Sequence, residues 1–385
     1  MTAVHHPLAP QDRATMVKIR EMAAPAKGVL ERDSFDVIIE HTPPANGVTY
    51  EQGFVGEIGG WWCRPLHPTP AAAILYLHGG AYILGTAKAY RNVVGQIAQR
   101  TQRAAFIPDY ALAPERPFPA AIQDVHAVYK SLLAQGIRDL ALVGDSAGGG
   151  LALALTSLLV AESERSEMRT PTRVAVMSPW TDLALTGATL VTLADADPLL
   201  TNAALAAAAK QYLANHDPRD PRASPLYASL RGLPPIRIDV GEDEILLDDA
   251  RRYAQKAAAA GGTTHCHTWE GMPHVFPANL GVLEAADAAL NDIASFLRGN
   301  TLHDGGRECG HFIAPKLRQE NVELIEEHHH DPSIVRRPAA GNCGFLRSGS
   351  AARLQRAEDQ RWNCDWQSET RGARLAGRPV HDPTG

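Results

Sequence analysis

A serine in a glycine-rich turn is the residue in this chain best suited to covalent chemistry. Ser146 lies in Gly144-Asp145-Ser146-Ala147-Gly148, a G-x-S-x-G pattern that follows an apolar run and precedes a stretch rich in Ala and Leu. That order predicts a strand, a tight turn and a helix whose N-terminus favours negative charge beside the serine. The pattern alone is weak evidence because glycine-rich chains also carry it by chance. Its setting makes Ser146 a candidate nucleophile.

A serine hydroxyl needs a general base to take its proton, and the base needs an acid to fix its tautomer. On a parallel α/β sheet these groups follow different strands in the order serine, acid, histidine. Asp243 comes just after an apolar run at 236–240, and His274 follows a second run at 264–269. We therefore predict a catalytic triad of Ser146, Asp243 and His274.

The acid of this triad has rivals close by in the sequence. Glu242 precedes Asp243, and Asp248 and Asp249 follow it within a few residues. The last two fall at the start of the next predicted helix, where acidic side chains are common as caps. Asp243 remains the preferred acid.

Ester hydrolysis by a serine also needs donors for the oxyanion that forms in the transition state. Gly79 and Gly80 follow a buried strand at 72–77, where bare backbone N–H groups can approach a substrate oxygen. The N–H of Ala147, directly after the serine, is the third predicted donor. We expect His78 to be structural, with its ring bonded to this loop rather than to substrate.

The elements that must position these groups alternate between strand and helix. Apolar runs and turn residues predict eight strands, at 48–55, 58–63, 72–77, 104–107, 140–143, 174–177, 236–240 and 264–269. Helices are expected at 90–103, 120–134, about 151–161, 202–215, 248–261 and 282–297. Alternation of this kind predicts a mostly parallel sheet with helices on both faces.

Three segments fall outside that alternation. Residues 1–45 have helical patches but no strand pattern, so they are expected to lie outside the sheet. Residues 185–230 interrupt the alternation of strands and helices, which indicates an insertion. Together with 1–45, this insertion is expected to cover the carboxyl ends of the strands. From 300 to 385 apolar periodicity is lost, which predicts a disordered extension.

The residues that carry this chemistry resemble the hormone-sensitive-lipase-like family of α/β-hydrolase carboxylesterases. The resemblance covers about 47–297 and rests on separate motifs: His78-Gly79-Gly80, residues 109–124, Gly144–Gly149, Ser178–Leu183, Ser224-Pro225-Leu226, Gly232–Pro235, Asp243 with Leu246 and Asp248, and His274 with Phe276. It implies an α/β-hydrolase fold at 46–299 with an eight-stranded sheet and a helical cap formed by 1–45 and 185–230. It also implies the same triad and oxyanion donors.

One departure from the family concerns the oxyanion loop. The family usually has H-G-G-G, whereas Ala81 replaces the third glycine here. A methyl group at that position is expected to be tolerated only with a negative φ, and it narrows the acyl pocket. Tyr82, Tyr212 and Phe276 are weaker candidates for lining that pocket.

Composition limits the remaining function classes. A formal net charge of −6 gives no reason to expect a nucleic-acid partner. No apolar run reaches the roughly 18 residues of a membrane span. Five scattered cysteines, among them Cys63 and Cys266, fit reduced thiols in the cytoplasm better than disulfides. His265 and His267 alternate on one strand but lack nearby carboxylates, so we expect them to face solvent, with no metal and no cofactor.

These observations predict a serine carboxylesterase that hydrolyses short- to medium-chain acyl esters, with lactones as a further substrate class. The alternatives are an amidase or formamidase that uses the same triad, and a ligand-binding member of the fold without catalysis. The family resemblance suggests a homodimer that pairs through the sheet edge beyond the last strand.

Overall fold

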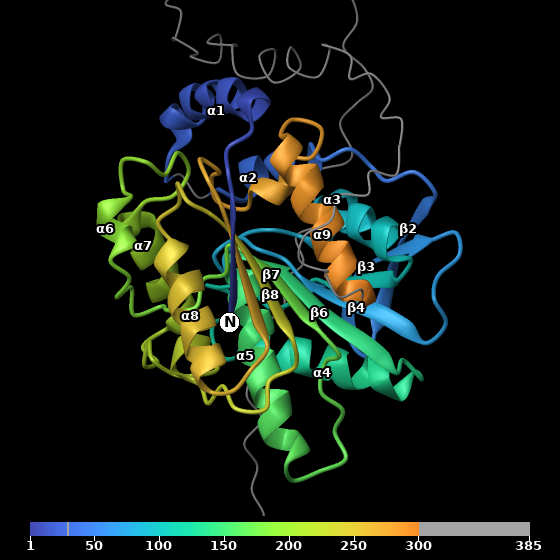
Figure 1. The fold of residues 1–385 in the computed structure, drawn as a ribbon. Helices are drawn as coiled ribbons and strands as arrows, with labels where there is room; N and C mark the ends of the chain where they lie inside the picture. Colours follow the sequence, from blue (N-terminus) through green and yellow to red (C-terminus); the bar gives the residue numbers. More distant parts are fainter. Residues whose placement is uncertain (29–30, 300–385) are drawn as a thin grey trace, which may run out of the picture. The chain divides into compact units, whose positions relative to one another are not determined.

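The computed structural model describes residues 1–28 and 31–299, and its framework is a nine-stranded sheet. The strands lie in the order β1-β9-β8-β7-β6-β4-β5-β3-β2 (Figure 1). Their bounds are β1 Thr2–His6, β2 Val48–Val55, β3 Ile58–Pro65, β4 Ala72–Leu77, β5 Ala104–Pro108, β6 Asp139–Asp145, β7 Val174–Met177, β8 Ile236–Gly241 and β9 Thr264–Trp269. Only the pairings β2–β3 and β3–β5 are antiparallel, so the mostly parallel sheet is confirmed.

The sheet has one strand more than the eight expected, because β1 pairs in parallel with β9 from Thr2↔His265 to His6↔Trp269. The expectation that residues 1–45 lie outside the sheet is therefore wrong for the five residues Thr2–His6. β1 is short and mostly exposed, so its sequence shows no apolar alternation. It also covers the edge of β9, so that edge is not open for pairing between subunits, and the homodimer stays a prediction.

Helices cover both faces of the sheet. α3 (Ala87–Thr101) and α9 (Glu284–Arg298) pack against each other on one face. α4 (Ala120–Ala134), α5 (Ser146–Ser163) and α8 (Leu247–Ala259) lie on the other face (Figure 1). The remaining helices are α1 (Pro10–Ala23), α2 (Arg32–Glu40), α6 (Thr189–Thr192) and α7 (Asn202–Leu213), with short 3₁₀ turns at Ala24–Ala26, Pro225–Tyr227 and Phe276–Ala278.

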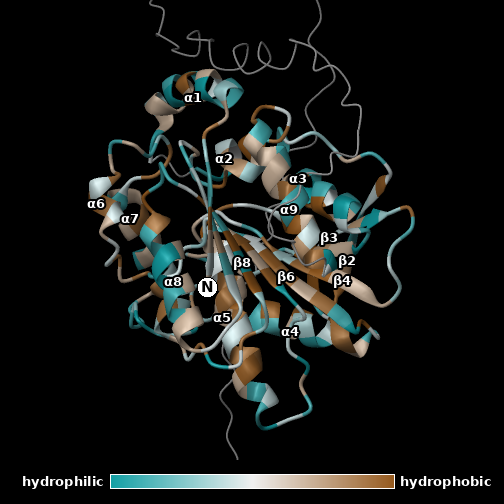
Figure 2. Cartoon of the chain, in the orientation of Figure 1, coloured by the Kyte–Doolittle hydropathy of each residue, from teal (hydrophilic) through white to brown (hydrophobic). Residues whose placement is uncertain are grey.

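The core lies on both sides of the central strands, which Figure 2 shows as the most hydrophobic part of the ribbon. All six residues of β4 are buried, and its side chains alternate between the two clusters: Leu75 packs towards α4 and α5, and Ile74 towards α3 and α9. α5 is the one helix in the described part that is long and apolar enough to span a membrane. Two-thirds of it, 67%, is buried inside the fold.

Two further expectations concern cysteines and the end of the chain. Cys63 and Cys266 are both free, as predicted, and both are buried. The predicted disordered extension, 300–385, lies outside the described residues.

Candidate active site

Ser146 stands at the junction of β6 and α5, where the chain turns from strand to helix. Its φ is +51°, a left-handed conformation that is strained for a residue other than glycine. It is partly exposed, whereas the residues on either side of it from Leu140 to Thr156 are buried. The turn therefore presents the serine to solvent, as predicted.

The glycines around Ser146 are required by close packing rather than by a bend at their own positions. Neither Gly144 nor Gly148 has a positive φ. A Cβ on Gly148 would lie 2.1 Å from the carbonyl oxygen of Leu77, and one on Gly144 would lie 2.5 Å from that of Gly148. These positions let α5 approach β4, which brings the loop after β4 against the serine turn.

His274 lies beside the serine, in the loop after β9. Its Nε2 is 2.9 Å from Ser146 Oγ, in hydrogen-bonding distance for proton transfer. The ring is 9% exposed. The structure thus brings together two members of the predicted triad.

The third member is Glu244 and not Asp243. Glu244 Oε2 is 2.5 Å from His274 Nδ1, and Glu244 is fully buried. Its other oxygen accepts hydrogen bonds from Ser178 Oγ at 2.7 Å and from Gly241 N at 2.8 Å. These two donors hold the carboxylate against the imidazole.

Asp243 points to the other side of the same turn. Its carboxylate pairs with Arg20 of α1, whose guanidinium also donates to the carbonyl oxygen of Ala196 at 2.6 Å. The prediction of Asp243 as the acid is therefore wrong. Glu244 was not among the rivals considered; its carboxylate is one methylene longer and is folded inward by the bond from Gly241. The signal available in the sequence was that a glutamate also serves as acid in this arrangement.

The surroundings of His274 tune its basicity. Burial lowers the pKa of its ring, but the adjacent Glu244 carboxylate and two other acidic groups together raise it, and the pKa ends above the ordinary 6.5. Asp197 and Asp145 act in the same direction as Glu244. Asp197 is a buried residue that the sequence reasoning missed, and it fixes the acid loop by accepting from Ile245 N at 2.8 Å.

Asp145, directly before the serine, organises the oxyanion loop. Its buried carboxylate accepts hydrogen bonds from Tyr76 Oη at 2.8 Å, Tyr90 Oη at 3.0 Å and the N–H of Gly79 at 3.0 Å. The N–H of Gly79 is thus already committed, so its prediction as an oxyanion donor is corrected. Gly79 has a different importance, since a Cβ there would lie 2.2 Å from the Asp145 carboxylate.

Three other N–H groups remain available around the serine. Those of Gly80, Ala81 and Ala147 have no acceptor among residues 1–28 and 31–299, and Ala147 lies in the first turn of α5, where N–H groups lack helical partners. His78 is structural, as expected, because it is buried and its Nδ1 lies 2.8 Å from the carbonyl oxygen of Gly79. Gly80, Ala81 and Ala147 are therefore the candidate oxyanion donors.

Ala81 adopts a conformation opposite to the one expected. Its φ is +53°, followed by +63° at Tyr82, so two side-chain-bearing residues in succession are left-handed. The left-handed region costs an L-residue about 1 kcal/mol, whereas glycine enters it freely. The loop after β4 therefore stores strain beside the serine.

Replacement of Ala81 by glycine is expected to raise the free energy of unfolding by about 1 kcal/mol, offset in part by the greater entropy of the unfolded chain. Chemical denaturation followed by circular dichroism measures this. Ala207→Gly, at an exposed position inside α7, is the matched control and should lower stability by about 1 kcal/mol. A loss of stability in both variants would show that Ala81 is unstrained.

Asp145 gives a pH-dependent prediction. Burial is the main reason that its pKa is raised, from 3.8 to about 6. The folded chain then holds the proton more tightly than the unfolded chain, so stability falls as pH rises between those values. Asp145→Asn removes this titration. From pH 4 to pH 7 the free energy of unfolding of the variant, relative to that of wild type, should therefore rise by about 2–3 kcal/mol. Denaturation curves at both pH values measure it.

Asp239→Asn is the control for that measurement. Burial raises the pKa of Asp239, but Arg237, His267 and Trp269 together lower it, so its net pKa lies below 3.8. Stability from such a group is already present above its unfolded pKa and is lost only in stronger acid, so between pH 4 and pH 7 the stability of Asp239→Asn relative to wild type should hardly change. The same pH trend in both variants would contradict the role assigned to Asp145.

The aromatic residues predicted to line the pocket lie in the core instead. Tyr82 and Tyr212 are fully buried and stack on each other with ring centroids 3.9 Å apart. Phe276 is also fully buried and packs against Trp269 at 5.2 Å. The assignment of these three residues to substrate binding is corrected: without exposed surface, they support the loops around the site.

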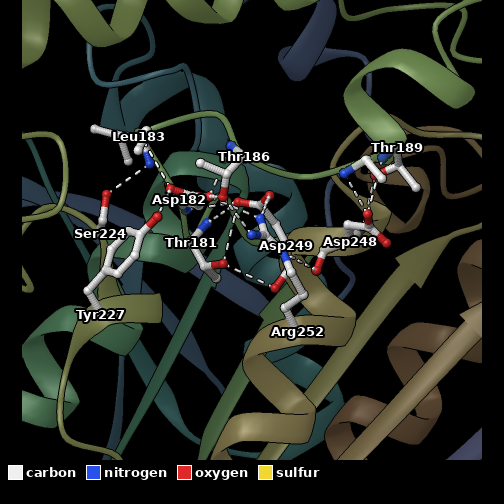
Figure 3. A network of polar contacts seen from close by, with 12 residues as sticks. Thr181, Asp182, Leu183, Thr186, Thr189, Ser224, Tyr227, Asp248, Asp249 and Arg252 are labelled. Atoms are coloured by element: carbon white, nitrogen blue, oxygen red, sulfur yellow. Dashed lines mark hydrogen bonds and ion pairs between the residues drawn. The ribbon is translucent and has the colours of Figure 1, made fainter.

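The insertion after β7 is fastened to α8 by a polar network (Figure 3). The Asp249 carboxylate accepts from the N–H groups of Thr181 and Asp182, each at 2.8 Å. Asp248 accepts from Ala188 N at 2.7 Å. Both acids therefore hold the loop that enters the insertion, whereas the sequence suggested only that they cap the following helix. This network fixes the start of the insertion beside the acid loop.

The comparisons with known proteins agree with this geometry. A family model described as "alpha/beta hydrolase fold" matches residues 74–278. An acetyl-hydrolase of Streptomyces hygroscopicus is 38% identical over 261 residues, covering 67% of this chain and 84% of that protein. An esterase of Acinetobacter venetianus is 42% identical over 226 residues, covering 58% of this chain and 73% of that protein.

Solved structures are similar over the same region. An esterase from the bacterial hormone-sensitive lipase family has a TM-score of 0.70 and 35% identity, covering 76% of this chain and 99% of its own. A second esterase, crystallised and soaked with p-nitrophenyl butyrate, has a TM-score of 0.69 and 36% identity with the same coverage. Another crystal structure of that second protein is of its complex with PMSF, at 36% identity.

Proposed function

We propose that Ser146, His274 and Glu244 are the catalytic triad of this chain, which belongs to the α/β-hydrolase family and is a serine carboxylesterase. We also propose that the enzyme prefers short-chain acyl esters. The observation that carries the triad is the continuous contact from Ser146 Oγ to His274 Nε2 and from His274 Nδ1 to Glu244. The three groups come from three loops at the carboxyl ends of strands, where ligands bind in α/β sheets.

The mechanism follows from these contacts. His274 takes the proton of Ser146 as its oxygen attacks the ester carbonyl carbon, and Glu244 stabilises the charged imidazole. The oxyanion of the tetrahedral intermediate is held by the N–H groups of Gly80, Ala81 and Ala147. His274 then gives its proton to the leaving alcohol, and the acyl group remains on Ser146. Water, deprotonated by His274, releases the acid and restores the serine.

The preference for short acyl groups rests on the loop after β4 and on the relatives. The methyl group of Ala81 stands where the related enzymes usually carry a third glycine, and the following Tyr82 is locked in the core by its stack on Tyr212. Among the relatives are an acetyl-hydrolase and an esterase soaked with p-nitrophenyl butyrate. We infer that acetyl and butyryl esters fit better than long-chain ones.

A panel of p-nitrophenyl acetate, butyrate and laurate tests this proposal, together with labelling by a fluorophosphonate probe. Acetate and butyrate should be hydrolysed faster than laurate, and one serine per chain should be labelled. A laurate preference would overturn the chain-length inference alone. Protein that is inert to all three esters and unlabelled by the probe would overturn the catalytic assignment. An acyl p-nitroanilide in the same panel distinguishes an amidase.

A further inference from the structure

A cluster of two histidines and an aspartate lies outside the catalytic triad, at the sheet edge formed by β1 and β9. His6 ends β1, His267 lies on β9, and Asp292 comes from α9. One potential metal-ligating atom from each lies within 4.8 Å of those of the other two. Three segments widely separated in the sequence thus place two imidazoles and a carboxylate around one point.

The two imidazoles are held in fixed positions. His6 Nε2 is 2.9 Å from His267 Nδ1, and the His6 ring stacks on Trp269 at 3.7 Å with nearly parallel planes. His267 is 2% exposed, so the expectation that it faces solvent is wrong, and its Nε2 is buried with no partner among the described residues. Whichever tautomer the pair adopts, that nitrogen is left with an unused proton or an unused lone pair. Protein groups alone therefore do not satisfy His267.

The charge around the cluster suits a cation. The nearby Arg237 is committed to Asp239 through contacts of 2.7 and 2.8 Å. Its contact with Asp292 is longer, at 3.5 Å. The negative charge of Asp292 is thus only partly compensated.

A small cavity lies beside His6, one of the three residues of the cluster. It has a volume of about 180 Å³ and is lined by His6 and Trp269 on one side. Its acidic side chains are Asp12, Glu270 and Glu284. Ala288 of α9 also lines it, one helical turn before Asp292. A cation can therefore approach His6 along an acidic path.

We propose that His6, His267 and Asp292 bind one divalent transition-metal ion of the zinc type, with water completing its coordination. Two imidazoles and one carboxylate suit Zn²⁺, Co²⁺ or Ni²⁺, whereas Mg²⁺ and Ca²⁺ prefer all-oxygen sites. The ion would join β1, β9 and α9, and so fasten the N-terminal strand to the sheet edge. Its role is structural, because its ligands take no part in the triad.

Calorimetric titration with ZnCl₂ and thermal unfolding with and without Zn²⁺ test the site in the full chain. All proteins carry alanine at His328, His329 and His330, since this run of histidines would bind metal itself. We expect one equivalent of Zn²⁺ per chain and a higher unfolding temperature, because the ion binds only the folded chain. Mg²⁺ should produce neither effect.

Three variants assign the ligands. His267→Gln and Asp292→Asn should each weaken Zn²⁺ binding by about tenfold or more. His265→Gln, on the same strand but outside the cluster, should leave it unchanged. Asp292 is partly exposed, so Asp292→Asn is expected to fold. This variant therefore still tests the site if His267→Gln fails to fold. Absence of Zn²⁺ binding in the parent, or equal affinity in Asp292→Asn, would overturn the proposal.

Discussion

Glu244→Gln is expected to lower kcat/KM for p-nitrophenyl butyrate by about a thousand- to ten-thousand-fold. The glutamine amide keeps the size of the side chain, but it presents N–H groups to His274 Nδ1 and so favours the tautomer with its proton on Nε2. That tautomer cannot accept the proton of Ser146. Steady-state kinetics on the purified variant measure the loss.

The pH profile supplies an independent readout of the same contact. Neutral His274 is the active base, so activity rises with pH through the pKa of its ring. Burial lowers that pKa, and the Glu244 carboxylate is the largest group that raises it. In Glu244→Gln the acid limb of the residual activity should therefore move to lower pH. A purely structural role for Glu244 would reduce activity without moving this limb.

Asp243→Asn is the matched control, one residue away in the same turn. Its carboxylate is 28% exposed and pairs with Arg20, not with His274. Loss of a partly exposed ion pair is worth at most about 1 kcal/mol, so kcat/KM should stay within about fivefold of wild type. A severe loss in Asp243→Asn with an active Glu244→Gln would restore Asp243 as the acid.

Ser146→Ala is expected to have the largest effect, a fall in kcat of about a millionfold. Without the hydroxyl no acyl-enzyme can form, and only the oxyanion donors and substrate binding remain to favour attack by water. Labelling by a fluorophosphonate should disappear together with hydrolysis of p-nitrophenyl butyrate. Release of p-nitrophenol in excess enzyme measures the residual rate.

Ser163→Ala controls for the loss of a serine hydroxyl from the same helix. Ser163 ends α5, and its hydroxyl bonds only to the carbonyl oxygen of Val160 at 2.7 Å within the described chain. Seventeen residues of helix separate it from Ser146 by about 26 Å. This variant should keep both labelling and activity. Equal activity of Ser146→Ala and wild type would refute Ser146 as the nucleophile.

The serine, the histidine and most of the sheet could be predicted from the sequence alone. The strand at 72–77 and the helix at 120–134 have the predicted bounds, because apolar runs and turn residues are local signals. The positions of Ser146 and His274 followed because residues just after parallel strands meet at one edge of a sheet. A five-residue polar strand at Thr2–His6 carries no such signal, and its pairing with β9 joins opposite ends of the described chain.

The tertiary structure decided which neighbouring groups face the substrate. Asp243 and Glu244 are adjacent acids, and only the turn, with Gly241 and Ser178 donating to Glu244, directs one to His274 and the other to Arg20. Likewise, only the packing of Asp145 against the oxyanion loop commits the N–H of Gly79. The physical reason is that spacing fixes where a residue lies along the chain, whereas side-chain direction depends on hydrogen bonds from distant segments.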